Sequence, residues 1–181
     1  MNLSNLKPAT KNCAGLATAW AAWRGEGLLP QRSDMRLEDI THVLPYICLA
    51  DVISETEIIF RLAGTFVREI MGVELTGRNF LDLTKPEYRA SRGARTMQNI
   101  TIPCGAIWIW EIEFAGRKCR QVEILSLPAR PNDPIRPMQM ISVFGLLEPA
   151  NRPRAVAHLQ QLAAADQHNF IDIGSGLPPN D

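Results

Sequence analysis

The sequence predicts an α+β domain built on one antiparallel sheet of five strands. Two apolar runs of strand length precede a stretch of helical segments, and three more such runs follow it. The chain has 181 residues, of which 46% are hydrophobic and 21% charged, and this composition suits one globular domain with a buried core. We therefore expect an N-terminal tail over 1–12, a domain over 13–148, and a C-terminal helix and flexible tail over 149–181.

The first element is a helix over 13–25, because Leu16, Trp20 and Trp23 recur at i, i+4 and i+7 in an Ala-rich background. A shorter helix is predicted over 36–43, with acidic residues near its start, where they complement the helix dipole. Gly residues follow the first segment and a Pro follows the second, so each helix has a stop signal.

Two strands come next, over 46–53 and 57–63, and a polar Ser-Glu-Thr turn joins them. In the second strand Phe60 and Leu62 alternate with Arg61. This alternation predicts one face in the core and the other in water.

Helical segments connect this pair to the rest of the sheet. They are expected over 65–71, over 79–83 and, as the longest, over 86–100, where Pro86 suits the first helical position. Met97 belongs to the apolar face of the longest segment.

Strand-like runs close the domain. In the first of them Trp108 and Trp110 share one face, as in a half-buried strand. The three strands are predicted over 106–114, 119–127 and 137–146. After them the chain offers one further helix, over about 153–165, and a Gly-, Pro- and Asn-rich end that we expect to be loosely held.

Several short motifs carry a family resemblance. They are Trp-Arg-Gly at 23–25, Leu-Pro at 29–30, Arg-Ser-Asp at 32–34, Leu-Pro at 44–45, Asp-Val at 51–52, Phe-Arg-Leu-Ala-Gly-Thr at 60–65 and Leu-Thr-Gly-Arg-Asn-Phe-Leu-Asp-Leu at 75–83. Over about residues 15–147 the sequence resembles an alphaproteobacterial family of PAS-like domains of unassigned function. The resemblance implies a PAS-like five-stranded antiparallel sheet with crossover helices on one face and an N-terminal helix.

A PAS domain holds its ligand between the inner face of the sheet and the crossover helices. The resemblance therefore implies a pocket lined by Phe60, Leu62, Phe66, Met71, Phe80, Met97, Trp108, Trp110, Met140, Ser142 and Phe144. The alternative is that these side chains simply fill a closed core. Ser142 favours a pocket, because a hydroxyl on an apolar stripe requires a backbone, water or ligand partner.

Residue types narrow the cofactors that a PAS domain is known to hold. A photoreactive flavin domain needs a cysteine in the crossover, and the corresponding segment over 77–81 has none. Haem sensing needs a histidine on the long crossover helix, whereas His42, His158 and His168 all lie outside it. Covalent flavin photochemistry and haem are thus disfavoured, and a non-covalent flavin or a small organic ligand stays open.

Charge and cysteine spacing bear on partners and location. Nineteen basic residues balance nineteen acidic ones, which disfavours binding to nucleic acid or anionic lipid. No apolar run reaches the roughly 18–20 residues of a membrane-spanning helix. The cysteines are far apart and form no metal set, and we expect a reduced, cytoplasmic protein with mostly buried thiols. They are Cys13, Cys48, Cys104 and Cys119.

Motifs of catalysis are missing: the sequence has no nucleophile elbow, phosphate loop, metal-binding histidine pair or dinucleotide fingerprint. Glu111, Glu113 and Glu123 are interpreted as a solvated outer face rather than as acid–base groups. We therefore expect no catalytic residues and no metal ligands, and a stand-alone sensory or regulatory domain that binds a small apolar or amphipathic ligand, a protein partner, or both. The alternatives are a small α+β enzyme that uses the apolar cavity and a pocketless dimerisation module.

The predicted N-terminal helix is the candidate interaction element. Leu16, Trp20 and Trp23 would either pack across a homodimer or partner interface, or dock against the domain's own sheet.

Overall fold

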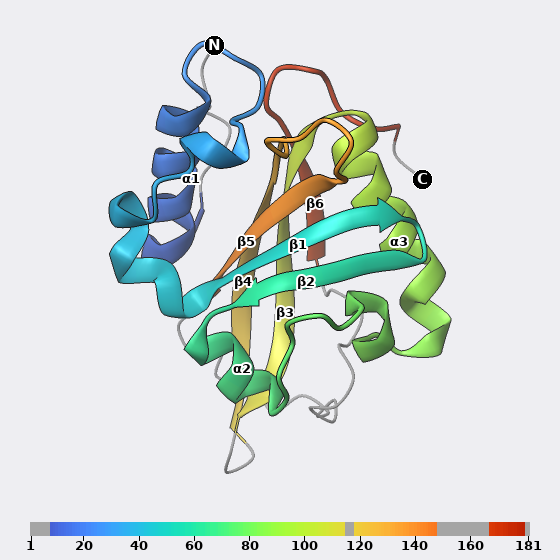
Figure 1. Cartoon of the computed structure of the whole chain (residues 1–181). Helices are drawn as coiled ribbons and strands as arrows, with labels where there is room; N and C mark the ends of the chain where they lie inside the picture. The colour runs from blue at the N-terminus through green and yellow to red at the C-terminus, as the bar shows by residue number, and fades with distance from the viewer. Residues whose placement is uncertain (1–7, 115–117, 148–166, 180–181) are drawn as a thin grey trace.

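The computed structural model describes residues 8–114, 118–147 and 167–179, and it confirms the α+β class (Figure 1). One antiparallel sheet of six strands runs in the order β2-β1-β5-β4-β3-β6. The strands are β1 (Ile47–Ser54), β2 (Glu57–Ala63), β3 (Cys104–Phe114), β4 (Lys118–Ala129), β5 (Met138–Leu146) and β6 (Gln167–Asp172).

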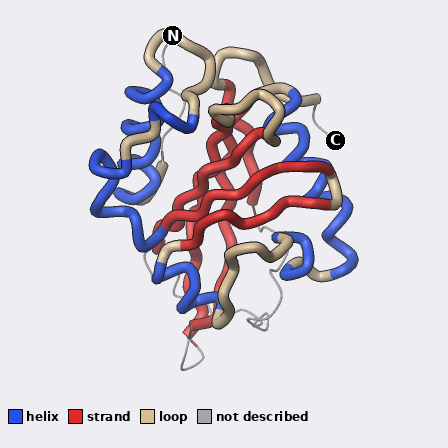
Figure 2. The backbone as a smooth tube through the Cα atoms, viewed as in Figure 1, coloured by secondary structure: helices blue, strands red, loops and turns tan. Residues whose placement is uncertain are grey.

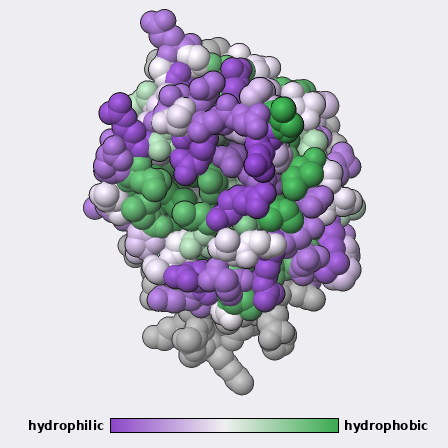
Figure 3. Space-filling view, in the orientation of Figure 1, coloured by the Kyte–Doolittle hydropathy of each residue, from purple (hydrophilic) through white to green (hydrophobic). Residues whose placement is uncertain are grey.

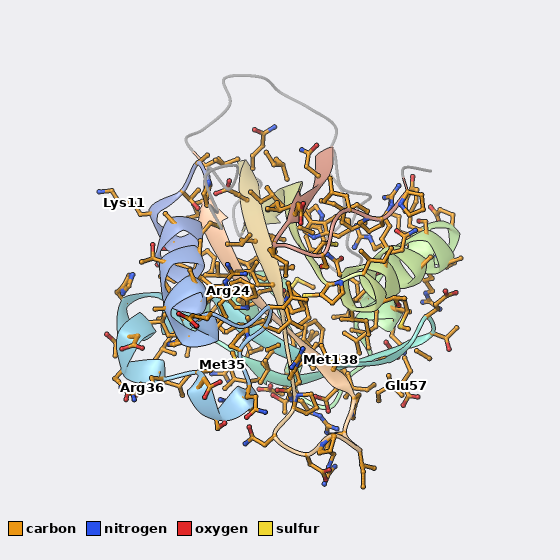
Figure 4. The ribbon with its side chains drawn as sticks, turned by 90° about the horizontal axis from the view of Figure 1, so that it is seen from above. Lys11, Arg24, Met35, Arg36, Glu57 and Met138 are labelled. Carbon is orange, nitrogen blue, oxygen red and sulfur yellow. The ribbon has the colours of Figure 1, made fainter. Side chains whose placement is uncertain are left out.

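Helices cover both faces of this sheet (Figure 2). The α-helices are α1 (Lys11–Arg24), α2 (Thr65–Met71) and α3 (Pro86–Thr101), and the 3₁₀ segments are η2 (Arg32–Asp34), η3 (Leu37–Tyr46) and η4 (Phe80–Leu83). Viewed from the front and from above, α1 and α3 lie on opposite sides of the sheet (Figures 1 and 4).

The outer face of the sheet packs against α1. Leu16 and Trp20 are fully buried there, and the indole nitrogen of Trp20 donates to the Pro128 carbonyl at 2.9 Å. Trp23 is 8% exposed and its indole donates to Asp39 at 2.8 Å. These three side chains therefore fill the core of their own chain and leave no free apolar surface, so an interface at these positions is not supported.

Glu123 on β4 corrects the interpretation of a solvated outer face. This residue is 2% exposed, and its carboxylate accepts from the backbone of Ala9 and Thr10 at 2.7 and 2.8 Å and from the Thr10 hydroxyl at 2.7 Å. Thr10 is also the N-cap of α1. The buried carboxylate thus fixes the start of α1 on the sheet. The side chains of Glu111 and Glu113 lie outside the described residues.

A β-bulge changes the face of one predicted pocket residue. Ala50 pairs with Phe60 and Leu49 with Leu62, so Arg61 is the extra residue in β2. Beyond the bulge the alternation shifts by one, and Leu62 lies on the opposite face from Phe60, 40% exposed. The prediction that Phe60 and Leu62 share the inner face was wrong for this reason.

Figure 3 shows an apolar area bordered by hydrophilic residues on the side of the molecule seen in Figure 1.

The C-terminal segment differs from the loosely held end that the sequence predicted. Residues 167–172 form β6, which pairs with β3 and adds a sixth strand to the five expected. Ile171 and Ile173 are 8% and 1% exposed, and Arg24 of α1 donates to the Ile173 carbonyl at 2.9 Å. The helix predicted over 153–165 lies outside the described residues.

Removal of the Glu123 carboxylate is expected to loosen α1. Glu123→Ala leaves the Ala9 and Thr10 donors without a partner in a partly buried place, which should lower the free energy of unfolding by about 2–3 kcal/mol. Glu123→Gln, which keeps the shape and one acceptor, should lose about half as much. Urea denaturation measures both, and equal stability of wild type and Glu123→Ala would contradict the role of this carboxylate.

Candidate functional site

A cavity of about 90 Å³ lies between the inner face of the sheet and the helical segments α2, η4 and α3. Eight of the eleven side chains predicted to form a pocket line it. They are Phe60, Met71, Phe80, Trp108, Trp110, Met140, Ser142 and Phe144. Their placement is a property of the structure, and their part in ligand binding stays a prediction.

The other three predicted residues lie away from the cavity. Leu62 points to the opposite face because of the bulge in β2. Phe66 packs against Tyr46 with ring centroids 4.6 Å apart, and Met97 contacts the margin of the inner core. These two side chains support the walls rather than line them.

A polar stripe on α3 is the part of the lining that the sequence interpretation missed. Arg92, Thr96 and Asn99 all line the cavity, and their spacing of i, i+4 and i+7 places them on one helix face. This spacing is readable in the sequence, but polar residues at helical spacing normally indicate a face in water. Here the face is buried, since Arg92 is 4% and Asn99 1% exposed.

Close approach to the first hairpin holds α3 in this position. A Cβ atom at Gly93 would overlap the carbonyl oxygen of Glu55, which lies in the turn between β1 and β2. Only glycine permits this contact, and Gly93 itself is buried. The neighbouring Arg92 is thereby carried under the sheet.

Two of the polar residues on α3 are satisfied. The Asn99 amide donates to the Cys104 carbonyl at 3.0 Å, and the Thr96 hydroxyl donates to the Arg92 carbonyl at 2.9 Å. Both hydrogen bonds are made within the chain, so these two side chains do not require a bound ligand.

Arg92 is not satisfied in the same way. Its Cζ atom lies 4.6 Å from the centre of the Trp110 ring and 5.8 Å from that of the Phe80 ring, so both rings make cation–π contacts with the guanidinium. Nη1 and Nη2 are buried and have no hydrogen-bond partner among the described residues, and the same is true of Trp110 Nε1. Burial lowers the pKa of Arg92 to about 10, which still leaves the side chain charged at neutral pH.

The aromatic wall that supports Arg92 is itself packed in order. Phe80 and Trp110 are stacked at 6.4 Å with an interplanar angle of 10°. Phe60 meets Phe80, and Phe144 meets Trp110, in edge-to-face contacts at 6.1 and 6.4 Å. Trp110 is thus held on both sides, and the ring that carries the cation is fixed.

Ser142 finds the partner that its position required in another side chain. Its hydroxyl lies 2.8 Å from that of Ser126, the residue directly opposite on β4. Both serines line the cavity. Each hydroxyl can accept as well as donate, so the pair keeps capacity for one more bond toward the cavity.

Cys48 lines the cavity as a neutral thiol. Burial raises the pKa of Cys48 to about 12, and the same cause raises the pKa of Cys13 to about 12 and that of Cys104 to about 11. None of these thiols is ionised at neutral pH, and a neutral thiol is a poor nucleophile. The side chain of Cys119 lies outside the described residues.

The described lining holds no carboxylate and no imidazole that could act as a general acid or base. In the described ranges no cluster of three or more His, Cys, Asp or Glu side chains could hold a metal ion. Over the same ranges, no helix has both the length and the apolar character needed to cross a membrane.

The order of strands and the cavity under the sheet agree with the comparison to known families. A family model described as PAS domain matches residues 9–148. The chain belongs to the PAS domain family. No curated protein matches the sequence.

Solved structures of PAS domains are also similar to this one. The Rhodobacter sphaeroides LOV protein is 16% identical with a TM-score of 0.45, and the match covers 64% of this chain and 68% of that one. The PAS domain of Bordetella pertussis BvgS is 13% identical with a TM-score of 0.45, over 62% of this chain and 86% of that one. Because both TM-scores are below 0.5, the assignment rests on the family match alone.

Arg92→Met is expected to stabilise the protein after any bound molecule has been removed by unfolding and refolding. The substitution removes a buried charge whose Nη atoms have no partner and keeps an apolar chain of similar length, so the free energy of unfolding should rise by about 1 kcal/mol despite the lost cation–π contact. Urea denaturation is the measurement. Arg78→Met, at an exposed position outside the lining, should change stability by less than about 0.5 kcal/mol. A loss of stability in Arg92→Met would mean that the cation–π contacts of Arg92 stabilise the fold by more than the burial of its charge destabilises it.

Proposed function

We propose that this PAS domain is a sensory or regulatory domain whose inner cavity binds a small amphipathic molecule. The observation that carries the proposal is the cavity of about 90 Å³, apolar over most of its wall but with unpaired donors on Arg92 and Trp110. A core that only had to be stable would not retain a buried cation without an acceptor, because such a group is costly. A bound molecule that supplies the acceptor explains its presence.

The size of the cavity limits the molecule. An engineered cavity of ~150 Å³ accepts one benzene ring, so a space of about 90 Å³ suits a compound of only a few heavy atoms. A three-ring flavin does not fit the cavity in this conformation. We propose a small organic ligand in place of the non-covalent flavin that the sequence left open.

An enzyme is the less supported alternative. The described lining has no acid–base pair, and its one thiol has a pKa raised to about 12 by burial. Filling or emptying the cavity would instead act through the surrounding elements on a partner. We propose a protein partner or a second copy of the chain in a reduced, cytoplasmic setting, and the exposed Ile53 and Leu62 on β1 and β2 are candidate contacts.

Native mass spectrometry of the purified protein beside its denatured mass tests the ligand and the oligomeric state together. A mass excess of a small molecule that disappears on denaturation is expected. A matching native and denatured mass, with no compound bound from a panel of small acids, alcohols and amides, would contradict the proposal.

A cavity-filling variant gives the control. Ala50 lines the cavity, and Ala50→Leu adds three carbons that fill part of it, so the mass excess should be lost while the fold is kept. Ala90→Leu makes the same change at an exposed position on α3 and should keep the ligand. Equal retention of the ligand in both variants would place the binding elsewhere on the protein.

A further inference from the structure

The unpaired donors in the cavity indicate the charge and the shape of the ligand that it can bind. Arg92 is the one charged side chain among the described lining residues. Trp110 and Phe80 make cation–π contacts with its guanidinium, but hydrogen bonds form at the edge of this group, where Nη1 and Nη2 have no partner in the described structure. The missing partner is therefore an acceptor that approaches the edge.

A carboxylate meets this requirement best. Its two oxygens lie in one plane at a spacing that matches the guanidinium fork, and the pairing neutralises a single positive charge. A phosphate dianion would bring a second negative charge, and Arg95, the neighbouring cation that interacts with Arg92, lies outside the lining. Trp110 Nε1 is a further buried donor without a partner and can serve the same anion.

The other side chains that line the cavity indicate what the rest of the ligand must be like. Opposite the helix, β5 presents Met140 and Phe144, which are each 6% exposed and carry no hydrogen-bonding side-chain group of ordinary strength. The Ser126 and Ser142 hydroxyls, on β4 and β5, already bond each other. An apolar body of about one or two carbons suits this wall and the volume of about 90 Å³.

From these contacts we propose that the cavity takes a small carboxylic acid, whose carboxylate pairs with Arg92 and accepts from Trp110 Nε1 while its short apolar body lies against Met140 and Phe144. This inference rests on the proposed ligand-binding function and names the class of ligand. It also explains why α3 turns a polar face inward, since the helix carries the anchor for the anion.

Matched pairs of compounds test the charge directly on the wild-type protein. Acetate, propionate and their amides and alcohols are titrated by isothermal calorimetry and by thermal unfolding. The acid should bind at least tenfold more tightly than the amide of the same skeleton and raise the unfolding temperature where the amide does not. The preference should persist from low to moderate salt, because a buried pair is screened much less than a surface pair.

Variants then locate the preference. Arg92→Met should lose the acid's advantage at least tenfold, whereas Arg78→Met, at an exposed position outside the lining, should keep it. Arg92→Lys keeps a cation without the planar fork and should fall between them. If Arg92→Met does not fold, the comparison of acid and amide on the wild type still decides the question.

The outcomes separate this inference from the function on which it rests. Equal binding of acid and amide, or a neutral compound released from the purified protein, would overturn the carboxylate and leave the sensory cavity standing. Absence of any bound compound in the titrations and in native mass spectra would overturn both. An acid preference that survives in Arg92→Met would place the anion at another cation and overturn the site.

Discussion

A guanidinium held inside an apolar cavity is the constraint on which the rest of the account depends. Arg92 lies on the buried face of α3, covered by Trp110 and Phe80 but without an acceptor for Nη1 and Nη2 in the described structure. Stacking on aromatic rings returns only part of the hydration that burial removes. Burial of the Arg92 guanidinium therefore lowers the free energy of unfolding of the empty domain. A bound ligand of opposite charge can restore that stability.

The two faces of the sheet are packed differently. On the outer face α1 forms a dense apolar layer around Trp20, and the Glu123 carboxylate fixes its first turn. On the inner face α2, η4 and α3 leave a small space instead of a closed core. A well-packed outer layer allows the inner layer to retain a buried cation, since the free energy of folding is summed over the whole domain.

Local periodicity in the sequence was sufficient for the five predicted strands and most helices, because each of these elements shows its own alternation or stop signal. Long-range pairing was not: β6 has the polar sequence Gln-His-Asn-Phe-Ile-Asp and is a strand through its ladder with β3. Leu62 was misplaced because a bulge is set by pairing with β1. The aromatic part of the lining followed from strand alternation, whereas Arg92, Thr96 and Asn99 have the spacing of a solvated face but line the cavity, with Arg92 and Asn99 buried and Thr96 half-buried beside the close contact at Gly93.

A crystal structure of the protein grown with an excess of a three-carbon carboxylic acid, and no other organic anion, tests the central claim most directly. The account predicts density for a planar group whose two oxygens lie within hydrogen-bonding distance of Arg92 Nη1 and Nη2, with its carbon chain toward Met140 and Phe144. Water alone on both nitrogens, or an Arg92 side chain paired with a carboxylate of the chain itself, would contradict it.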